Sequence, residues 1–183
     1  MAVRERISEQ TYQEIALGDD DRTWELYDGR LVEKPAMSAK HNFQVSFLHG
    51  TLFNQLHWNE FQVRSNSTRL RHSPENAYVP DVLVLPAELF QAQASFETYS
   101  APLPLVIEVW SPSTGGFDVG TKLANYQRRG DLEIWRIHPR ERTLTAWRRQ
   151  PEGAFEETVY HGGIVRPKFL PNLAIDPDAL LAV

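Results

Sequence analysis

The strongest constraint on the fold comes from two short apolar runs that each carry one carboxylate. The first run, residues 82–85, directly follows Asp81. The second run, residues 105–110, is interrupted by Glu108. Burying an unpaired carboxylate in an apolar interior is very unfavourable, so such a group is paired, protonated or bound to a metal. If the two runs form neighbouring strands, the two acids come close enough to share a divalent cation.

The length and composition of the chain predict one globular domain that spans residues 1–183 and buries a hydrophobic core. The sequence contains no cysteine, which excludes disulfides, thiolate zinc sites and cysteine nucleophiles. No segment reaches the roughly 20 apolar residues that cross a bilayer, and the first residues lack the apolar core of a signal peptide. We therefore expect a cytoplasmic protein that does not enter a membrane.

The remaining pattern predicts helices and strands that follow one another along the chain. Ser8 is placed to cap a helix that ends near Leu17. The pair Asp28-Gly29 is a strong turn signal between strands at 24–27 and 30–33, so an N-terminal β-hairpin is expected. Further strands are expected at 61–65, 68–71, 79–85, 105–110, 132–138, 143–149 and 155–160, and helices at 38–59, 86–94, 118–129 and 178–181. This order indicates an α/β or α+β fold with a central mixed β-sheet flanked by helices.

The long helix expected at 38–59 carries an apolar pattern. Phe43, Phe47, Leu48, Leu52 and Leu56 recur at helical spacing. We expect these five side chains to form one buried stripe.

A lysine completes the chemistry that the two acids suggest. Lys122 lies four residues after Asp118 in the helix expected at 118–129, so the two share a helical face. Mg²⁺ binds carboxylate oxygens and waters, acidifies a bound water and neutralises charge on a phosphate. A nearby lysine can orient the attacking water or stabilise the transition state. Acid, acid and lysine in this order predict a metal-dependent phosphodiesterase, with the Val109 carbonyl as a further oxygen ligand.

Each of these residues also has a purely structural interpretation. Asp81 could be a strand-edge aspartate, Glu108 could pair with a core arginine, and Lys122 could be a surface partner of Asp118. The pair Pro177-Asp178 repeats Pro80-Asp81 in a turn-rich tail, where it is expected to be structural.

The charge distribution leaves the nature of the partner open. The net charge of −5 argues against a dedicated nucleic-acid binder, because phosphate affinity comes from Lys and Arg. Residues 118–149, however, contain eight Lys or Arg against four Asp or Glu. This segment is either solvated surface or a nucleic-acid contact.

Taken together, the site residues resemble the PD-(D/E)xK nuclease superfamily and, more closely, the Uma-two family of proposed bacterial endonucleases. The matching residues occur in the family's order over roughly residues 8–180. They are the stretches 24–33, 79–82, 106–114 and 133–135, together with His41, Asp118, Lys122, Tyr126 and Gly130. The resemblance implies a restriction-endonuclease-like fold and a DNA endonuclease that uses Mg²⁺ or Mn²⁺. It also implies a homodimer, since nucleases of this fold often pair to cut two strands.

The resemblance also implies roles for individual residues. Asp81 and Glu108, with the Val109 carbonyl, would hold the metal. The superfamily lysine normally stands two residues after the glutamate, where this chain has Trp110, so Lys122 of the following helix takes that role.

Two further residues match family positions. Glu25 would be an additional acid, and His41 would contact phosphate or water. Their structural alternatives are an exposed strand acid and a histidine at a helix N-terminus.

Two other classes of function remain open on the sequence. A module of the same fold could bind nucleic acid or metal without turnover. A structural or partner-binding protein could neutralise its buried acids with arginines.

Overall fold

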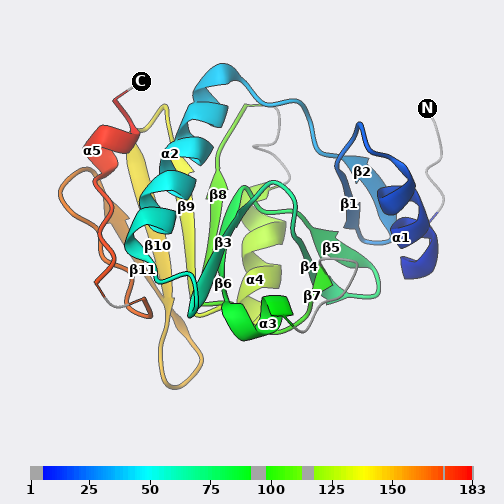
Figure 1. The fold of residues 1–183 in the computed structure, drawn as a ribbon. Helices are drawn as coiled ribbons and strands as arrows, with labels where there is room; N and C mark the ends of the chain where they lie inside the picture. The colour runs from blue at the N-terminus through cyan, green and yellow to red at the C-terminus, as the bar shows by residue number, and fades with distance from the viewer. Residues whose placement is uncertain (1–5, 92–97, 113–117, 171, 183) are drawn as a thin grey trace.

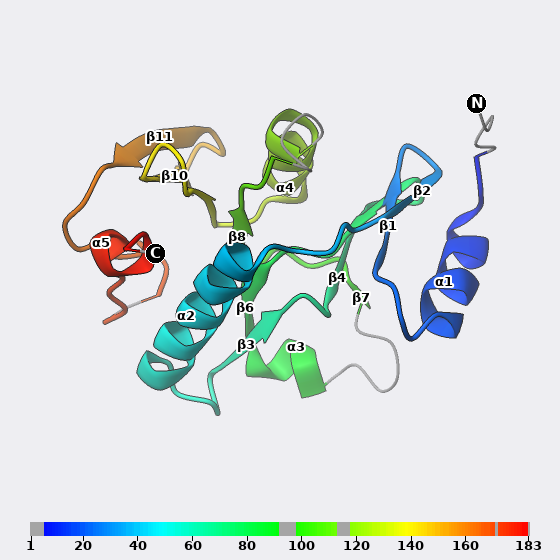
Figure 2. The same ribbon diagram turned by 90° about the horizontal axis from the view of Figure 1, so that it is seen from above.

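The computed structural model describes residues 6–91, 98–112, 118–170 and 172–182. Two β-sheets lie side by side, and helices flank them (Figure 1 and Figure 2). The helices are α1 (Glu9–Gly18), α2 (Ala39–Gln55), α3 (Ala87–Gln91), the π-type turn η1 (Asp118–Lys122), α4 (Leu123–Arg129) and α5 (Pro177–Leu180). The strands are β1 (Trp24–Tyr27), β2 (Arg30–Glu33), β3 (Phe61–Ser65), β4 (Arg69–Ser73), β5 (Asn76–Tyr78), β6 (Val82–Pro86), β7 (Thr98–Tyr99), β8 (Leu105–Val109), β9 (Glu133–His138), β10 (Thr143–Arg149) and β11 (Phe155–Tyr160).

The larger sheet has six strands in the order β11-β10-β9-β8-β6-β3. It is mixed, because β8 and β9 pair in parallel whereas its other neighbours pair antiparallel. The strands of the two acids, β6 and β8, are neighbours, as predicted. Their register pairs Val82 with Ile107. Continuing that antiparallel register by one residue brings Asp81 opposite Glu108, and opposite residues face the same side of a sheet.

The smaller sheet has five strands in the order β2-β1-β5-β4-β7. Its hairpin β1–β2 was predicted, and both turn residues, Asp28 (φ 53°) and Gly29 (φ 73°), adopt the left-handed conformation that such tight turns require. The existence of a second sheet was not predicted. The expected strands at 61–65 and 68–71 separate at Asn66, whose φ is 53°, so β3 joins one sheet and β4 the other.

Helices α2 and α4 lie on opposite faces of the larger sheet (Figure 2). On the α2 side, Leu48 and Leu52 pack with Ile107 and Val109 of β8. On the α4 side, Tyr126 packs with Val106. That second cluster also contains side chains of the smaller sheet, so the core is continuous between the two sheets.

The burial of α2 corrects the predicted stripe. The helix ends at Gln55, and its buried residues are His41, Gln44, Val45, Leu48 and Leu52. Phe43 is 41% exposed, and Phe47 is only partly buried. Two polar side chains therefore occupy the inward positions of the first turns, and the sequence pattern pointed to the aromatic residues instead.

The C-terminal part of the larger sheet agrees with the pattern of the sequence. The helical segment formed by η1 and α4 ends at Gly130, a left-handed C-cap with φ 88°.

Ser113 and Thr114 of the family-like stretch, and residues 92–94 of the helix expected at 86–94, lie outside the described residues. Among the helices of the described ranges, none has the length and apolar character to cross a membrane.

Packing of α2 against the larger sheet is expected to dominate the stability of that side of the core. Leu48 is fully buried there. The substitution Leu48→Ala should lower the free energy of unfolding by about 2–5 kcal/mol, because it removes buried methyl groups and leaves a cavity. Leu17→Ala on α1, where the side chain is 55% exposed, is the matched control and should change it by less than about 0.5 kcal/mol. Urea denaturation measures both, and equal effects would contradict this assignment of the core.

Candidate functional site

Asp81 directly precedes β6 and is 2% exposed. Its Oδ2 accepts a hydrogen bond from the backbone N–H of Val109 at 2.7 Å. Its Oδ1 lies 2.8 Å from Lys34 Nζ and 3.3 Å from His41 Nε2. The carboxylate therefore links the end of β8 to Lys34, which follows the β1–β2 hairpin, and to His41 in the first turn of α2.

Lys34 is a site residue that the sequence analysis missed. Its ammonium group is buried and also donates to the Val79 carbonyl and to Asn66 Oδ1, each at 2.9 Å. A lysine that directly follows the hairpin strand β2 has the pattern of a solvated surface residue. The available signal was its position directly after the family-like stretch 24–33.

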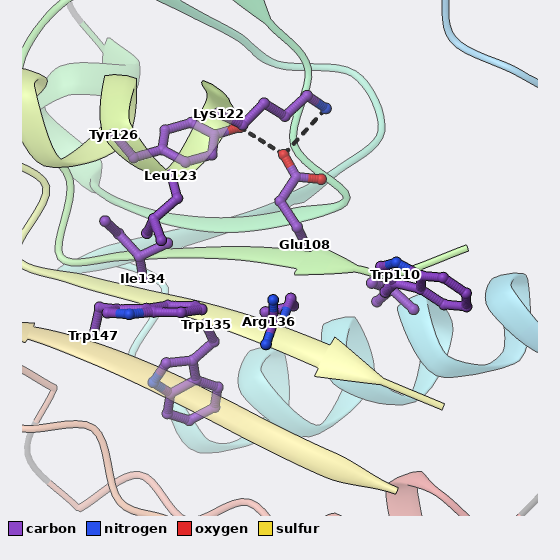
Figure 3. Close-up of a pocket in the computed structure, with 10 residues that line it drawn as sticks. Glu108, Trp110, Lys122, Leu123, Tyr126, Ile134, Trp135, Arg136 and Trp147 are labelled. Carbon is purple, nitrogen blue, oxygen red and sulfur yellow. Dashed lines mark hydrogen bonds and ion pairs between the residues drawn. The ribbon is translucent and has the colours of Figure 1, made fainter. Parts of the chain in front are cut away.

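Glu108 lies in β8 and contacts the helical segment η1–α4 (Figure 3). Its Oε1 accepts a hydrogen bond from the Tyr126 hydroxyl at 2.6 Å and lies 3.3 Å from Lys122 Nζ. In Figure 3, Glu108 points from β8 toward Lys122 and Tyr126. The predicted acid and the predicted lysine are thus in direct contact.

Glu25 of β1 joins the same group. Lys122 Nζ lies 3.1 Å from Glu25 Oε1, which also accepts the Val79 N–H at 2.7 Å. Tyr27 donates its hydroxyl to Glu25 Oε2 at 2.8 Å. Glu25 is therefore a buried carboxylate at the junction of the two sheets, and the alternative of an exposed strand acid is wrong.

Burial and charge set the protonation states of these groups. Burial by itself would raise the pKa of Asp81, but Lys34 and His41 together hold that pKa well below its usual range. Burial would lower the pKa of Lys122, but Glu108 and Glu25 raise it well above its usual value. Burial and Glu108 raise the pKa of Tyr126. At neutral pH the site therefore contains an ionised Asp81, a cationic Lys122 and a Tyr126 hydroxyl that donates to Glu108.

The cationic state of Lys122 limits its chemistry. A protonated ammonium group cannot accept a proton, so Lys122 is unsuited to be a general base. It can neutralise developing negative charge or orient a water through its N–H donors.

The donor set suits a hard cation such as Mg²⁺. Within the described ranges, no group of three or more His, Cys, Asp or Glu side chains is arranged to hold a metal ion. Mg²⁺ does not need such a cage, because it usually binds through one or two carboxylates together with waters and substrate phosphate. Asp81 and Glu108, opposite each other on neighbouring strands, provide two carboxylates of this kind.

A small cavity of about 30 Å³ adjoins Glu108 and Lys122, enough for one or two waters. Leu123, Ile134 and Trp147 form part of its apolar wall (Figure 3). Arg136 of β9 also lines the cavity and is the strand partner of Glu108 in the parallel pair β8–β9. Sequence analysis did not single out Arg136, which adds a fixed positive charge beside the acid.

Other cations of the basic segment 118–149 serve the fold. Arg129 pairs with the buried Asp131, and Arg148 pairs with the buried Glu133 at 3.0 Å. Much of the predicted basic segment is thus structural.

Comparisons with known proteins agree with the resemblance noted in the sequence. A family model described as "Uma2: Putative restriction endonuclease" matches residues 9–178. A crystal structure described as "a putative nuclease belonging to DUF820 from Anabaena variabilis ATCC 29413" is similar, with a TM-score of 0.78 at 19% sequence identity, covering 96% of this chain and 98% of that chain. At this identity the similarity supports the fold alone, and it confirms the predicted fold class. No curated protein matches the chain.

The pair formed by Asp81 and Lys34 predicts a pH-dependent stability. Because the folded-state pKa of Asp81 is depressed, its stabilisation is present above about pH 4 and is lost as the pH falls toward that folded value. Lys34→Met removes the compensating charge from a buried carboxylate and should cost about 3–5 kcal/mol at pH 7. The difference from wild type should shrink as the pH falls, because burial without Lys34 raises the pKa of Asp81, so the acid takes up a proton in the variant at a higher pH than in wild type.

Urea denaturation at a series of pH values measures this difference. Lys168→Met, at an exposed lysine, is the matched control and should leave stability unchanged within about 0.5 kcal/mol. A loss in Lys34→Met that is independent of pH would show that the lysine acts through packing rather than through Asp81.

Proposed function

The chain belongs to the Uma2 family, and we propose that it is a divalent-metal-dependent endonuclease that hydrolyses phosphodiester bonds of DNA. Family membership and fold support a nuclease. The observation that carries the proposal is that both acids lie at the end of β8: Asp81 accepts a hydrogen bond from Val109, and the neighbouring Glu108 contacts the buried, cationic Lys122. Three such groups together fit phosphoryl transfer better than a structural role.

Asp81 and Glu108 would hold Mg²⁺ or Mn²⁺, and the carbonyl of Val109 would add an oxygen ligand. When bound, the ion would supply positive charge at the phosphate and acidify a water. The N–H of Val109 already donates to Asp81, so the backbone of this residue lies beside the carboxylate.

Lys122 and Arg136 would act on the phosphodiester. In hydrolysis a water oxygen bonds to phosphorus, the bond to one ester oxygen breaks, and a proton from the water ends on the leaving oxygen. Negative charge on the phosphoryl oxygens grows during this step, and fixed cations in a buried site stabilise it without reorganisation. Glu25 and Tyr126 would keep Lys122 and Glu108 in position, and His41 would orient Asp81.

One observation favours a second candidate, a module of the same fold that binds nucleic acid without cleaving it. Asp81 and Glu108 each have a lysine within 3.3 Å, so their charges are compensated without a metal. If these ion pairs persist in the presence of metal and DNA, turnover would not occur. A structural protein whose acids are neutralised by arginines is less well supported, because lysines pair with Asp81 and Glu108.

The setting of the reaction follows from the same proposal. A homodimer would bring two sites to the two strands of a duplex, and we expect the protein to act in the cytoplasm. Analytical ultracentrifugation with and without duplex DNA would show whether two copies assemble.

Metal binding should be visible as a change in thermal stability. A ligand at about 100 times its dissociation constant stabilises a protein by roughly 2.7 kcal/mol. Mg²⁺ or Mn²⁺ should therefore raise the melting temperature of wild type, and Glu108→Gln should abolish the increase because it removes a charged ligand. Glu157→Gln, an exposed acid on β11, should keep it. An unchanged metal response in Glu108→Gln would remove Glu108 from the metal site.

Cleavage should depend on Lys122 more than on any surface lysine. Lys122→Met should lower turnover by about 10²–10³, the cost of losing one preorganised electrostatic donor. DNA binding should change little, because one phosphate contact is a small part of a polyelectrolyte interaction. Nicking of supercoiled plasmid and of single-stranded DNA, with Mg²⁺ or Mn²⁺, measures the effect.

Three variants make this assay decisive. Asp81→Asn should also be inactive, whereas Lys168→Met should match wild type. Since Lys122 is buried between Glu25 and Glu108, circular dichroism must show that Lys122→Met is folded, and Lys122→Arg tests whether the charge alone restores activity. Equal nicking by all proteins would mean contamination, and DNA binding without cleavage by wild type would favour the binding module.

A further inference from the structure

A second, larger cavity of about 370 Å³ lies beside His41 and shares Trp110 with the first cavity. It is lined by the first turns of α2, by the residues that follow β8 and by the turn between β9 and β10. Its volume is in the range of roughly 300–1,000 Å³ that is typical of small-molecule sites. His41 lines this cavity, and its Nε2 lies 3.3 Å from Asp81 Oδ1.

The unusual feature of the cavity is Gln44. Its side chain is 0% exposed, and within the described part of the chain neither Oε1 nor Nε2 has a hydrogen-bond partner. Buried polar groups in folded proteins are nearly always paired, because an unmade hydrogen bond is costly. An apolar residue of similar size would fit this inward position of α2 better, so the amide points to a ligand.

The other lining residues suit a ligand that combines a flat ring with polar edges and a negatively charged group. The Trp110 ring is half-buried and stacks on His138 at 4.3 Å between centroids, which holds it in a fixed orientation. The guanidinium of Arg140 lies 5.6 Å from the centre of the Trp110 ring. Lys40 adds a second cation.

We propose that this cavity takes an unstacked nucleobase of the DNA strand, with Gln44 bonding to the edge of the base and Trp110 offering a stacking surface. A glutamine amide presents one donor and one acceptor side by side, which matches the N6 and N7 atoms of adenine. Base–aromatic stacking adds affinity for any base. Arg140 and Lys40 then lie where the flanking phosphates enter.

A phosphate alone explains the cavity less well. The cations and the N-terminus of α2 would attract it. An ionised phosphate, however, offers only acceptors, so it would satisfy Gln44 Nε2 and leave Oε1 unpaired. A base edge satisfies both atoms.

This inference rests on the proposed function, and it defines the substrate further. A base held in the cavity is joined through its sugar to a phosphate, and His41 connects the cavity to Asp81. The reactive nucleotide therefore has to leave the base stack, so the strand that is cut is single-stranded, mismatched or opened at that nucleotide.

Binding to two oligonucleotide probes in the absence of metal tests the inference independently of cleavage. The probes are fluorescein-labelled single-stranded oligonucleotides of equal length, one of deoxyadenosines and one with abasic sites in the same backbone. In fluorescence anisotropy with EDTA, wild type should bind the first about 10-fold more tightly than the second, the effect of one bidentate base contact with stacking. Gln44→Leu should lose most of that preference while its affinity for the abasic strand stays the same.

Stability separates a ligand-binding role of Gln44 from a structural one. Gln44→Leu should unfold at the same or a higher urea concentration than wild type, because it replaces an unpaired buried amide with an apolar side chain. Gln10→Leu, at an exposed glutamine of α1, is the control and should keep the base preference.

The outcomes distinguish the two proposals. Equal binding of both probes by wild type, an unchanged preference in Gln44→Leu, or no binding of either probe would overturn the base site. A base preference that depends on Gln44, found together with no cleavage that depends on Asp81, would keep the base site and overturn the nuclease.

Discussion

The structure depends on the compensation of buried carboxylates by buried lysines. Asp81 and Glu25 are almost fully buried, and each has a lysine ammonium within 3.1 Å. Desolvating a carboxylate and an ammonium costs several kcal/mol per ion, and their attraction repays this only when further hydrogen bonds complete both groups. Here the backbone supplies those bonds. The Val79 N–H donates to Glu25, the Val79 carbonyl accepts from Lys34, and the Val109 N–H donates to Asp81. The segment between β5 and β6 thereby contacts both ion pairs, Lys34–Asp81 and Lys122–Glu25. Loss of one partner of either pair would leave the charge of the other partner buried and uncompensated.

This arrangement assembles the site from distant parts of the chain. Lys34 follows the hairpin of the smaller sheet, Asp81 begins a strand of the larger sheet, and Lys122 comes from the helical turn η1. Each ion pair joins two of these parts: Lys34–Asp81 joins the two sheets, Lys122–Glu25 joins η1 to the smaller sheet, and Lys122–Glu108 joins η1 to the larger sheet. The same ion pairs therefore stabilise the junction between the sheets and fix the geometry of the site. A variant that destabilises the junction should also disturb the site.

Sequence reasoning succeeded where a residue type conflicts with its local pattern. Asp81 and Glu108 stood out because they adjoin or interrupt short apolar strands, and the predicted adjacency of these strands is confirmed by the pair β6–β8, whose antiparallel direction was not predicted. It failed where the deciding contact is distant in sequence. Lys34 is buried only because Val79 and Asp81, more than 40 residues away, meet its ammonium group. Helical spacing alone predicted burial of the aromatic Phe43, whereas Gln44 is the residue that faces inward in the structure. The division into two sheets depends on the left-handed Asn66, which looks like an ordinary loop residue in the sequence.

Charge balance gives the proposed site an order of binding. Asp81, Glu108 and Glu25 are acidic, and Lys34, Lys122 and Arg136 are basic, so the formal charges of these six side chains cancel. A divalent cation alone would give this group a net charge of +2 in a largely buried space, where uncompensated charge is costly. A phosphodiester contributes −1 and so reduces this excess of positive charge. We therefore expect metal and DNA to increase each other's affinity, and by linkage the two effects must be equal. The lysines that compensate the buried acids would then prevent tight metal binding until a phosphate is present.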